Sequence, residues 1–200
     1  MPNRYDAADR RTGKLIRQHE AEFQNLRLRF PLDHLNVVLL KRYAKAMYKR
    51  MDKRNRETYL AIAMAAYAGM SQAAAEKLVD RVLSAYDPVT GYVYDREVGR
   101  KRDRLVESMA AAQSRSALRE ANGRANRLWM AQVKQFADEI VDGAVLDSYR
   151  DAGVHRVRWV TIPDEQRCAH CAKLNDREFS IDSIPAKPHP KCRCYVVPVA

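Results

Sequence analysis

The feature that most constrains this chain is that all four of its cysteines fall within residues 168–194, in the stretch CAHCAKLNDREFSIDSIPAKPHPKCRC. The candidate metal ligands in it are Cys168, Cys171, His189, Cys192 and Cys194. Zinc prefers four nitrogen or sulfur ligands in a tetrahedron, and a closed set of such ligands holds a small fold together without doing chemistry. We therefore predict about one structural zinc ion per chain. The first two cysteines, with C-x2-C spacing, are the firmest ligands, and two of the last three candidates complete the site.

Other uses of the cysteines fit less well. Two disulfides would suit the even count, but the first 15 residues are charged and contain no apolar stretch, so no secretory signal is predicted. In a reducing compartment, clustered cysteines more often bind metal than pair. A redox C-x2-C would open a helix of a βαβ unit, and a zinc deaminase needs H-x-E before its P-C-x2-C. Neither pattern is present.

The rest of the chain divides into a helical part and a short β-rich part. Residues 1–152 are rich in helix-forming residues, with Ser71 as the predicted N-cap of a helix over 72–85 and Gly153 as a predicted C-cap. We expect Asn122 and Gly123 to break the last long helix. Beyond them HRVRWVTI, REFSI and CYVVPV predict short strands.

We therefore predict an α+β fold, with a helical domain over residues 1–152 and a Cys/His-rich β module over 153–200. A module with three short strands buries little apolar surface and needs a staple. The longest apolar run, YLAIAMAAYAGM, is too short to span a bilayer, so we expect a soluble, intracellular protein without a membrane partner.

The net charge of +11 predicts an acidic partner, such as nucleic acid or an acidic protein surface. Lysines at four-residue steps share one face of a predicted helix, and arginines cluster later in the chain. The candidate contacts are Lys41, Lys45, Lys49, Lys53, Arg100 and Arg104. A charge row of this kind is either a solvated outer face or a surface for phosphates or acidic side chains, and the sequence leaves both interpretations open.

Catalytic signatures are few. Asp164 and Glu165 follow a predicted strand, where such residues more often cap a turn than act as acid and base. No phosphate-binding loop, nucleophile elbow or paired-carboxylate pattern is present in the sequence. We expect that the protein is not an enzyme.

Taken together, the C-terminal motifs resemble those of the Mu F-like phage head-morphogenesis family, the minor head or minor capsid proteins of tailed phages. The shared order is W-x-T, D-E-R, C-x2-C, a short L-D-G-x-x-F segment and H-P-x-C-R-C. It covers residues 155–198 closely, as WVTIPDEQRCAHCAKLNDREF and PHPKCRC. One departure is Asp176 in place of the usual glycine, and we expect Asn175 to keep the turn instead.

The resemblance implies a structural role without catalysis. Such proteins associate with the phage portal and with capsid or scaffold proteins during prohead assembly in the host cytoplasm. They then stay in the virion, inside the head near the portal, where this one would contact packaged double-stranded DNA non-specifically. The alternatives are an independent zinc-containing nucleic-acid-binding module and, less favoured, a nuclease or transferase with a site around Asp164, Glu165 and His189.

Overall fold

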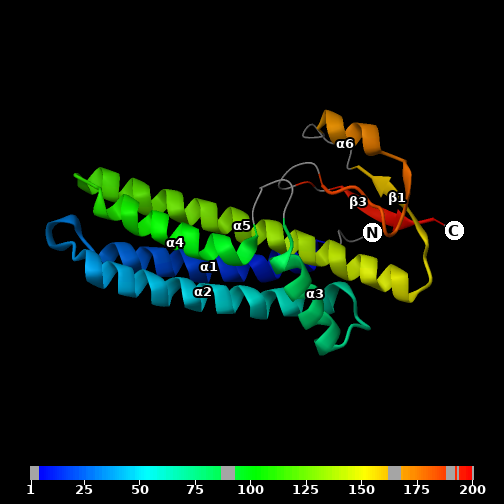
Figure 1. Cartoon of the computed structure of the whole chain (residues 1–200), viewed down its shortest axis with the longest axis horizontal. Helices are drawn as coiled ribbons and strands as arrows, with labels where there is room; N and C mark the ends of the chain where they lie inside the picture. Colours follow the sequence, from blue (N-terminus) through cyan, green and yellow to red (C-terminus); the bar gives the residue numbers. More distant parts are fainter. Residues whose placement is uncertain (1–4, 87–92, 162–167, 188–191, 193, 200) are drawn as a thin grey trace.

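The structure, a computed structural model, describes residues 5–86, 93–161, 168–187, 192 and 194–199. Its helices form an elongated body, and a small sheet lies at one end of that body (Figure 1). The helical elements of the body are α1 (Asp6–Arg29), the short 3-10 turn η1 (Leu32–His34), α2 (Val37–Ala66), α3 (Gln72–Ser84), α4 (Tyr94–Ala110) and α5 (Arg115–Asp151).

Short polar side chains begin three of these helices by accepting backbone N–H groups that have no partner inside the helix. The Ser71 hydroxyl accepts the N–H of Ala74 at 3.2 Å, which confirms it as the N-cap of α3. Asn36 caps α2 through the N–H of Leu39 at 3.0 Å. Ser114 caps α5 in the same way.

The predicted break at Asn122 and Gly123 is wrong, because α5 runs through both residues from Arg115 to Asp151. The chain instead leaves the helical conformation between α4 and α5, just before Ser114. Asn122 is held inside the helix by a contact with α1, where its side-chain amide donates to the carbonyl of Phe23 at 3.1 Å. That buried hydrogen bond offsets the weak helix propensity of the Asn-Gly pair.

Gly153 ends α5, as predicted. It has a φ of +72°, in the left-handed region that glycine adopts without steric cost. Its N–H donates to the Arg150 carbonyl at 2.9 Å, and the N–H of Val154 donates to the Tyr149 carbonyl at 2.9 Å. These two bonds form a Schellman motif, which turns the chain out of the helix and toward the sheet.

Two apolar clusters fill the helical body, and α5 contributes to both. One cluster lies toward the sheet and includes Tyr59, Tyr94 and Phe136; the other lies toward the α1–α2 connection and includes Phe23 and Trp129. Because α5 packs against each of α1 to α4, it is the central helix of the body.

The sheet has three antiparallel strands in the order β2-β1-β3: β1 (Arg156–Val160), β2 (Glu178–Ser180) and β3 (Tyr195–Pro198). Val157 lies opposite Phe179 on one side and Pro198 on the other. Val157 and Trp159 are buried whereas Arg156 and Arg158 are exposed, the period-two pattern of a half-buried strand. The α+β fold class is confirmed.

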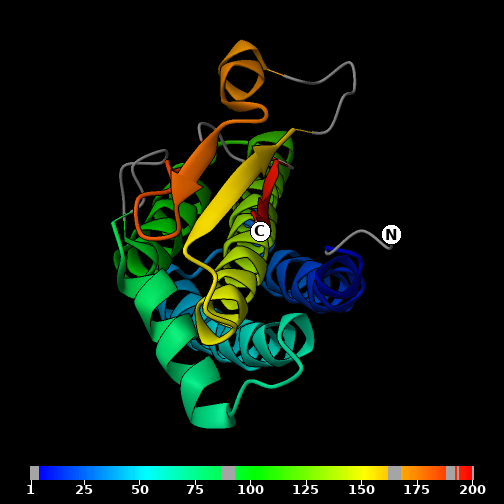
Figure 2. The same cartoon turned by 90° about the vertical axis from the view of Figure 1, so that its right-hand side faces the viewer.

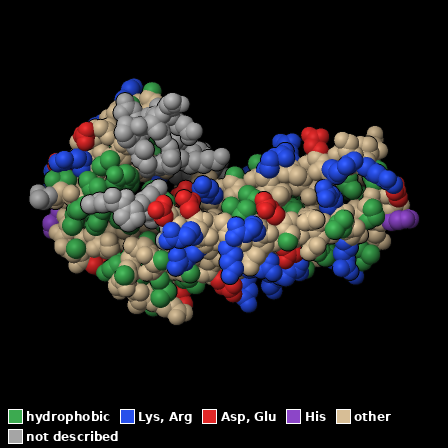
Figure 3. All heavy atoms as spheres, turned by 180° about the vertical axis from the view of Figure 1, so that it is seen from behind, with side chains coloured by type: hydrophobic (Ala, Val, Ile, Leu, Met, Phe, Trp, Pro, Cys, Tyr) green, Lys and Arg blue, Asp and Glu red, His purple; other side chains and the backbone are tan. Residues whose placement is uncertain are grey.

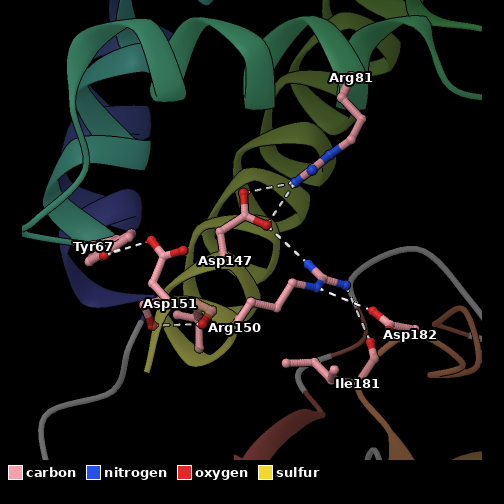
Figure 4. Close-up of polar contacts among 9 residues, drawn as sticks. Tyr67, Arg81, Asp147, Arg150, Asp151, Ile181 and Asp182 are labelled. Carbon is pink, nitrogen blue, oxygen red and sulfur yellow. Dashed lines mark hydrogen bonds and ion pairs between the residues drawn. The ribbon is translucent and has the colours of Figure 1, made fainter. Parts of the chain in front are cut away.

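The module of sheet and α6 (Ala169–Leu174) lies on the C-terminal half of α5 (Figure 2). Leu146 and Tyr149 of α5 pack against the apolar cluster of the module. Polar contacts reinforce this packing (Figure 4): Asp147 accepts hydrogen bonds from both Arg81 of α3 and Arg150, and Arg150 also donates to the Ile181 carbonyl at 3.3 Å. These contacts fix the module to α5, and Asp147 joins α3 to the same network.

Candidate metal centre

Three of the four cysteine thiols come together in the core of the module. Cys171 lies on α6, while Cys192 and Cys194 lie just before β3. Their sulfur atoms are all within 4.8 Å of one another, and all three residues are buried. The Cys171 and Cys192 sulfurs are 3.6 Å apart, too far for a disulfide bond, and all four cysteines are free thiols.

Cys168 lies one helical turn from this group. It is the N-cap of α6, and its sulfur accepts the backbone N–H of Cys171 at 3.2 Å. This cap explains the local fold, because the C-x2-C spacing ties the first turn of α6 to the thiol that precedes it. Cys168 is half-buried, whereas Cys171 is buried.

The turn after α6 fixes this helix to the central strand. Asn175 and Asp176 form the middle of the turn, and it is Asp176 that has a positive φ, of 60°. The left-handed conformation at the position of the usual glycine is thus taken by Asp176 itself, which aspartate tolerates, and the contribution of Asn175 to the turn comes from its side chain. Asn175 accepts hydrogen bonds from the Thr161 N–H at 2.9 Å and hydroxyl at 2.7 Å.

The donor set fits a soft metal ion. Buried thiols with no cation nearby stay protonated, and burial raises the pKa values of Cys171 and Cys192 above their usual range. A bound cation would stabilise the thiolates in place of those protons, as in structural metal sites. The buried group of three cysteines could therefore hold a metal ion. Cys168 does not belong to this group, but its sulfur lies 3.2 Å from the backbone nitrogen of Cys171.

The remaining predicted ligand, His189, lies outside the described residues, as do Asp164 and Glu165. His170, between the first two cysteines, is exposed on α6. Among the described residues, the cysteines are the only group of three or more His, Cys, Asp or Glu side chains close enough to share an ion.

The predicted cationic face is exposed along α2. Lys41, Lys45 and Lys49 form no ion pair with any described residue, while Lys53 lies 3.8 Å from Glu57. Viewed from behind, the helical body carries many Lys and Arg side chains along its length (Figure 3).

Not every cation of the body is available to a partner. Arg100 pairs with Glu97 at 2.5 Å within α4, and Arg50 and Arg54 both bind Glu22, which joins α2 to α1. Arg104, in contrast, is exposed and has no ion pair within the described part of the chain.

A polar junction beside the cysteines was not predicted from the sequence. Tyr5 at the start of α1, Asp142 of α5 and Lys187 meet there, and Lys187 donates to the carbonyl of Cys192 at 3.1 Å. No local signal marks these residues, because they are far apart in the chain and each belongs to a common residue type.

No helix in the described residues is both long enough and apolar enough to cross a membrane. Comparison of the chain with models of protein families, with curated proteins and with solved structures found no match.

Proposed function

We propose that this chain is a minor head protein of a tailed phage, a structural component that acts in prohead assembly at the portal and stays inside the head. The observation that carries this proposal is that Cys171 of the C-x2-C half of the family-like pattern and both cysteines of the C-x-C half meet in one buried thiol group. Cysteines that matched the pattern by chance would not need to lie close together in the fold. The proposal gives the chain no catalytic role.

We infer that the ion held by this group is zinc. Three thiols from α6 and the segment before β3 supply most of a tetrahedron, and Cys168 or His189 would supply the fourth ligand. Zinc held in this way would cross-link α6 to β3 and have no reactive position, as in closed structural sites.

Metal analysis of protein purified without chelators tests the zinc site. We expect about one zinc per chain in the wild type and a large loss in a Cys171→Ser, Cys192→Ser double variant. An exposed-site variant, His170→Asn, is the matched control and should keep its zinc. Fewer than about 0.2 zinc per folded wild-type chain would contradict the site.

Exposed apolar side chains at the far end of the body support a protein partner. Leu28, Val38 and Leu39 are 67%, 60% and 51% exposed, and they flank the α1–α2 connection. Val37, Val38 and Leu39 are consecutive and exposed, which is uncommon on a surface that faces only water. A portal or capsid subunit with an apolar, acidic surface would cover these residues and pair with the neighbouring exposed Arg27, Arg29 and Arg42.

The exposed lysines of α2 that pair with no described residue support a second contact, with the phosphates of packaged DNA. Such contacts are electrostatic and independent of sequence, so binding should weaken steeply as salt rises from about 50 to 200 mM. In a Lys41→Gln, Lys45→Gln, Lys49→Gln variant the slope of log affinity against log salt should fall by about 2–3. The control changes three exposed lysines on separate helices: Lys14→Gln, Lys77→Gln and Lys173→Gln.

Peptide mass spectrometry of purified heads tests the whole proposal. Heads from an induced culture are separated into DNA-free and DNA-filled particles, and this chain should be present at low copy in both. A Val38→Ser, Leu39→Ser variant should be incorporated less, whereas Met64→Ser, at an exposed position elsewhere on α2, should be incorporated normally. If the wild-type chain is abundant in the lysate yet absent from particles, the independent nucleic-acid-binding module becomes the better interpretation.

A further inference from the structure

The start of α1, the middle of α5 and the cysteine segment are joined by one set of polar contacts. The Tyr5 hydroxyl donates to one carboxylate oxygen of Asp142 at 2.7 Å, and the Lys187 ammonium lies 2.5 Å from the other. Lys187 also donates to the Tyr5 hydroxyl oxygen at 3.0 Å. Each of the three side chains therefore contacts the other two.

This junction contacts the backbone of the metal-binding segment directly. Lys187 donates to the carbonyl of Cys192 at 3.1 Å, and the Tyr5 hydroxyl lies 3.4 Å from the carbonyl oxygen of Cys194. Both carbonyls belong to residues of the buried thiol group. The groups that orient these two cysteines thus come from the helical body as well as from the module.

The junction is shielded enough for its hydrogen bonds to matter. Tyr5 is 5% exposed and belongs to the apolar cluster of the body near the sheet. The side chains of Lys187 and Asp142 are 22% and 23% exposed. Charge-assisted hydrogen bonds at partly buried positions are stronger than those on an open surface, and they hold donor and acceptor in one geometry.

In metal sites, the groups that hold the ligands affect affinity strongly, typically by 10–100-fold when they are removed. We propose that Tyr5, Asp142 and Lys187 are positioning residues of the cysteine metal site. Metal binding and the docking of the start of α1 onto α5 are then coupled. This inference rests on the proposed metal binding but not on the proposed role in phage heads.

The coupling is reciprocal. If the docked junction raises the affinity of the cysteines for the ion, the bound ion stabilises the docked junction by the same factor. Tyr5 lies 137 residues from Asp142 and 182 from Lys187, so their contacts exist only when the first turn of α1 is in place. The stability of the first turn of α1 should therefore depend on whether an ion is bound at the cysteines.

The test measures zinc affinity by competition with a chromophoric chelator, using the full-length chain. Tyr5→Phe keeps the ring and removes only the hydroxyl, so the apolar packing is retained. Its matched control is Tyr67→Phe, because the Tyr67 hydroxyl likewise donates to a carboxylate, that of Asp151 at 2.8 Å (Figure 4). Lys187→Met and its exposed control Lys173→Met form the second pair.

We expect zinc affinity to fall by about 10-fold or more in Tyr5→Phe and Lys187→Met and to change less than about twofold in the two controls. Backbone hydrogen exchange over residues 6–15 supplies the reciprocal measurement. Exchange there should slow when zinc is added to the wild type, and this effect should be reduced in Tyr5→Phe.

Two results would overturn the inference. The first result is that Tyr5→Phe and Lys187→Met bind zinc as tightly as the wild type and that hydrogen exchange at the start of α1 does not change when zinc is added. This result would contradict the coupling and leave the metal site intact. Failure of the wild type to bind zinc at all would remove the metal site itself, and the coupling with it.

Discussion

His19 should make the helical body sensitive to acid. It is fully buried on α1, where its Nδ1 accepts a hydrogen bond from the indole N–H of Trp129 at 2.9 Å. Its Nε2 has no partner among the described residues. Burial is the main cause that lowers the pKa of His19 to about 4, and the nearby Arg54 lowers it further, while Glu22 acts in the opposite direction.

The size of the effect follows from the two pKa values. In the unfolded chain His19 has a pKa near 6.5, so it takes up a proton as pH falls while the folded state resists it. The stability that depends on neutral His19 is therefore fully present above about pH 6.5 and is lost as pH falls toward 4. The loss is about 2 kcal/mol at pH 5 and about 3 kcal/mol below pH 4.

Urea unfolding of the wild type and of His19→Asn, at pH 8 and at pH 5, measures this loss. Asparagine does not titrate, and its side-chain oxygen replaces Nδ1 as an acceptor for Trp129. Between pH 8 and pH 5, the unfolding free energy of the wild type should fall by about 2 kcal/mol more than that of the variant.

The comparison between variants matters because metal release at low pH affects both proteins alike and cancels in the difference. His34→Asn changes an exposed histidine on η1 and should behave as the wild type does. If His19→Asn and the wild type lose stability in parallel, within about 0.5 kcal/mol, the assignment of His19 as a buried neutral side chain is wrong.

Two further substitutions test the body. Burial raises the pKa of Asp138 to about 6, and Asp142 also raises it, so ionisation of Asp138 lowers the stability of the fold as pH rises from about 4 to 6. In urea unfolding with zinc present, Asp138→Asn should be more stable than the wild type by up to about 3 kcal/mol at pH 7.5. At pH 4 it should be no more stable than the wild type. The buried Tyr94 hydroxyl accepts from the Asn55 amide at 2.8 Å and donates to Asp52 at 3.0 Å. Tyr94→Phe should therefore lower the unfolding free energy by about 1–3 kcal/mol, and no change in thermal or urea unfolding would contradict this.

Signals confined to a few neighbouring residues predicted the fold well. Ser71 and Gly153 were identified as caps from their residue types and positions, and the structure confirms both. The β-branched alternation of residues 155–162 likewise predicted β1. For the two caps, the atoms that decide the conformation are within about five residues of one another in the chain.

Features that depend on contacts between residues far apart in the chain were not predicted from the sequence. Asn122 looked like a helix breaker because its bond to the Phe23 carbonyl, 99 residues away, is not visible in the sequence. The hydrogen bond from Trp129 to His19 joins residues 110 apart, and His19 alone gave no reason to expect a buried site. Propensity is a weak prior, and tertiary contacts override it at such positions.

The candidate metal site was predicted in part: the sequence identified the ligand types but not which sulfurs lie closest together. Spacing alone identified the cysteines and favoured the C-x2-C pair as the firmest ligands. The tightest group of sulfurs instead contains one member of that pair, Cys171, with Cys192 and Cys194, while Cys168 caps α6. Spacing gives the donor types, but the distances between donors depend on how α6 packs against β3.

The prediction that the small module needs a staple underestimates what the helical body supplies. The apolar cluster of the module is completed by Leu146 and Tyr149 of α5, and Arg150 binds the Ile181 carbonyl, so the β2 side of the sheet has support that does not involve the cysteines. The segment before β3, in contrast, is held by the thiol group and by Lys187. A metal ion bound by the three cysteines would act on this second side, because it would join Cys171 of α6 to the two cysteines that precede β3.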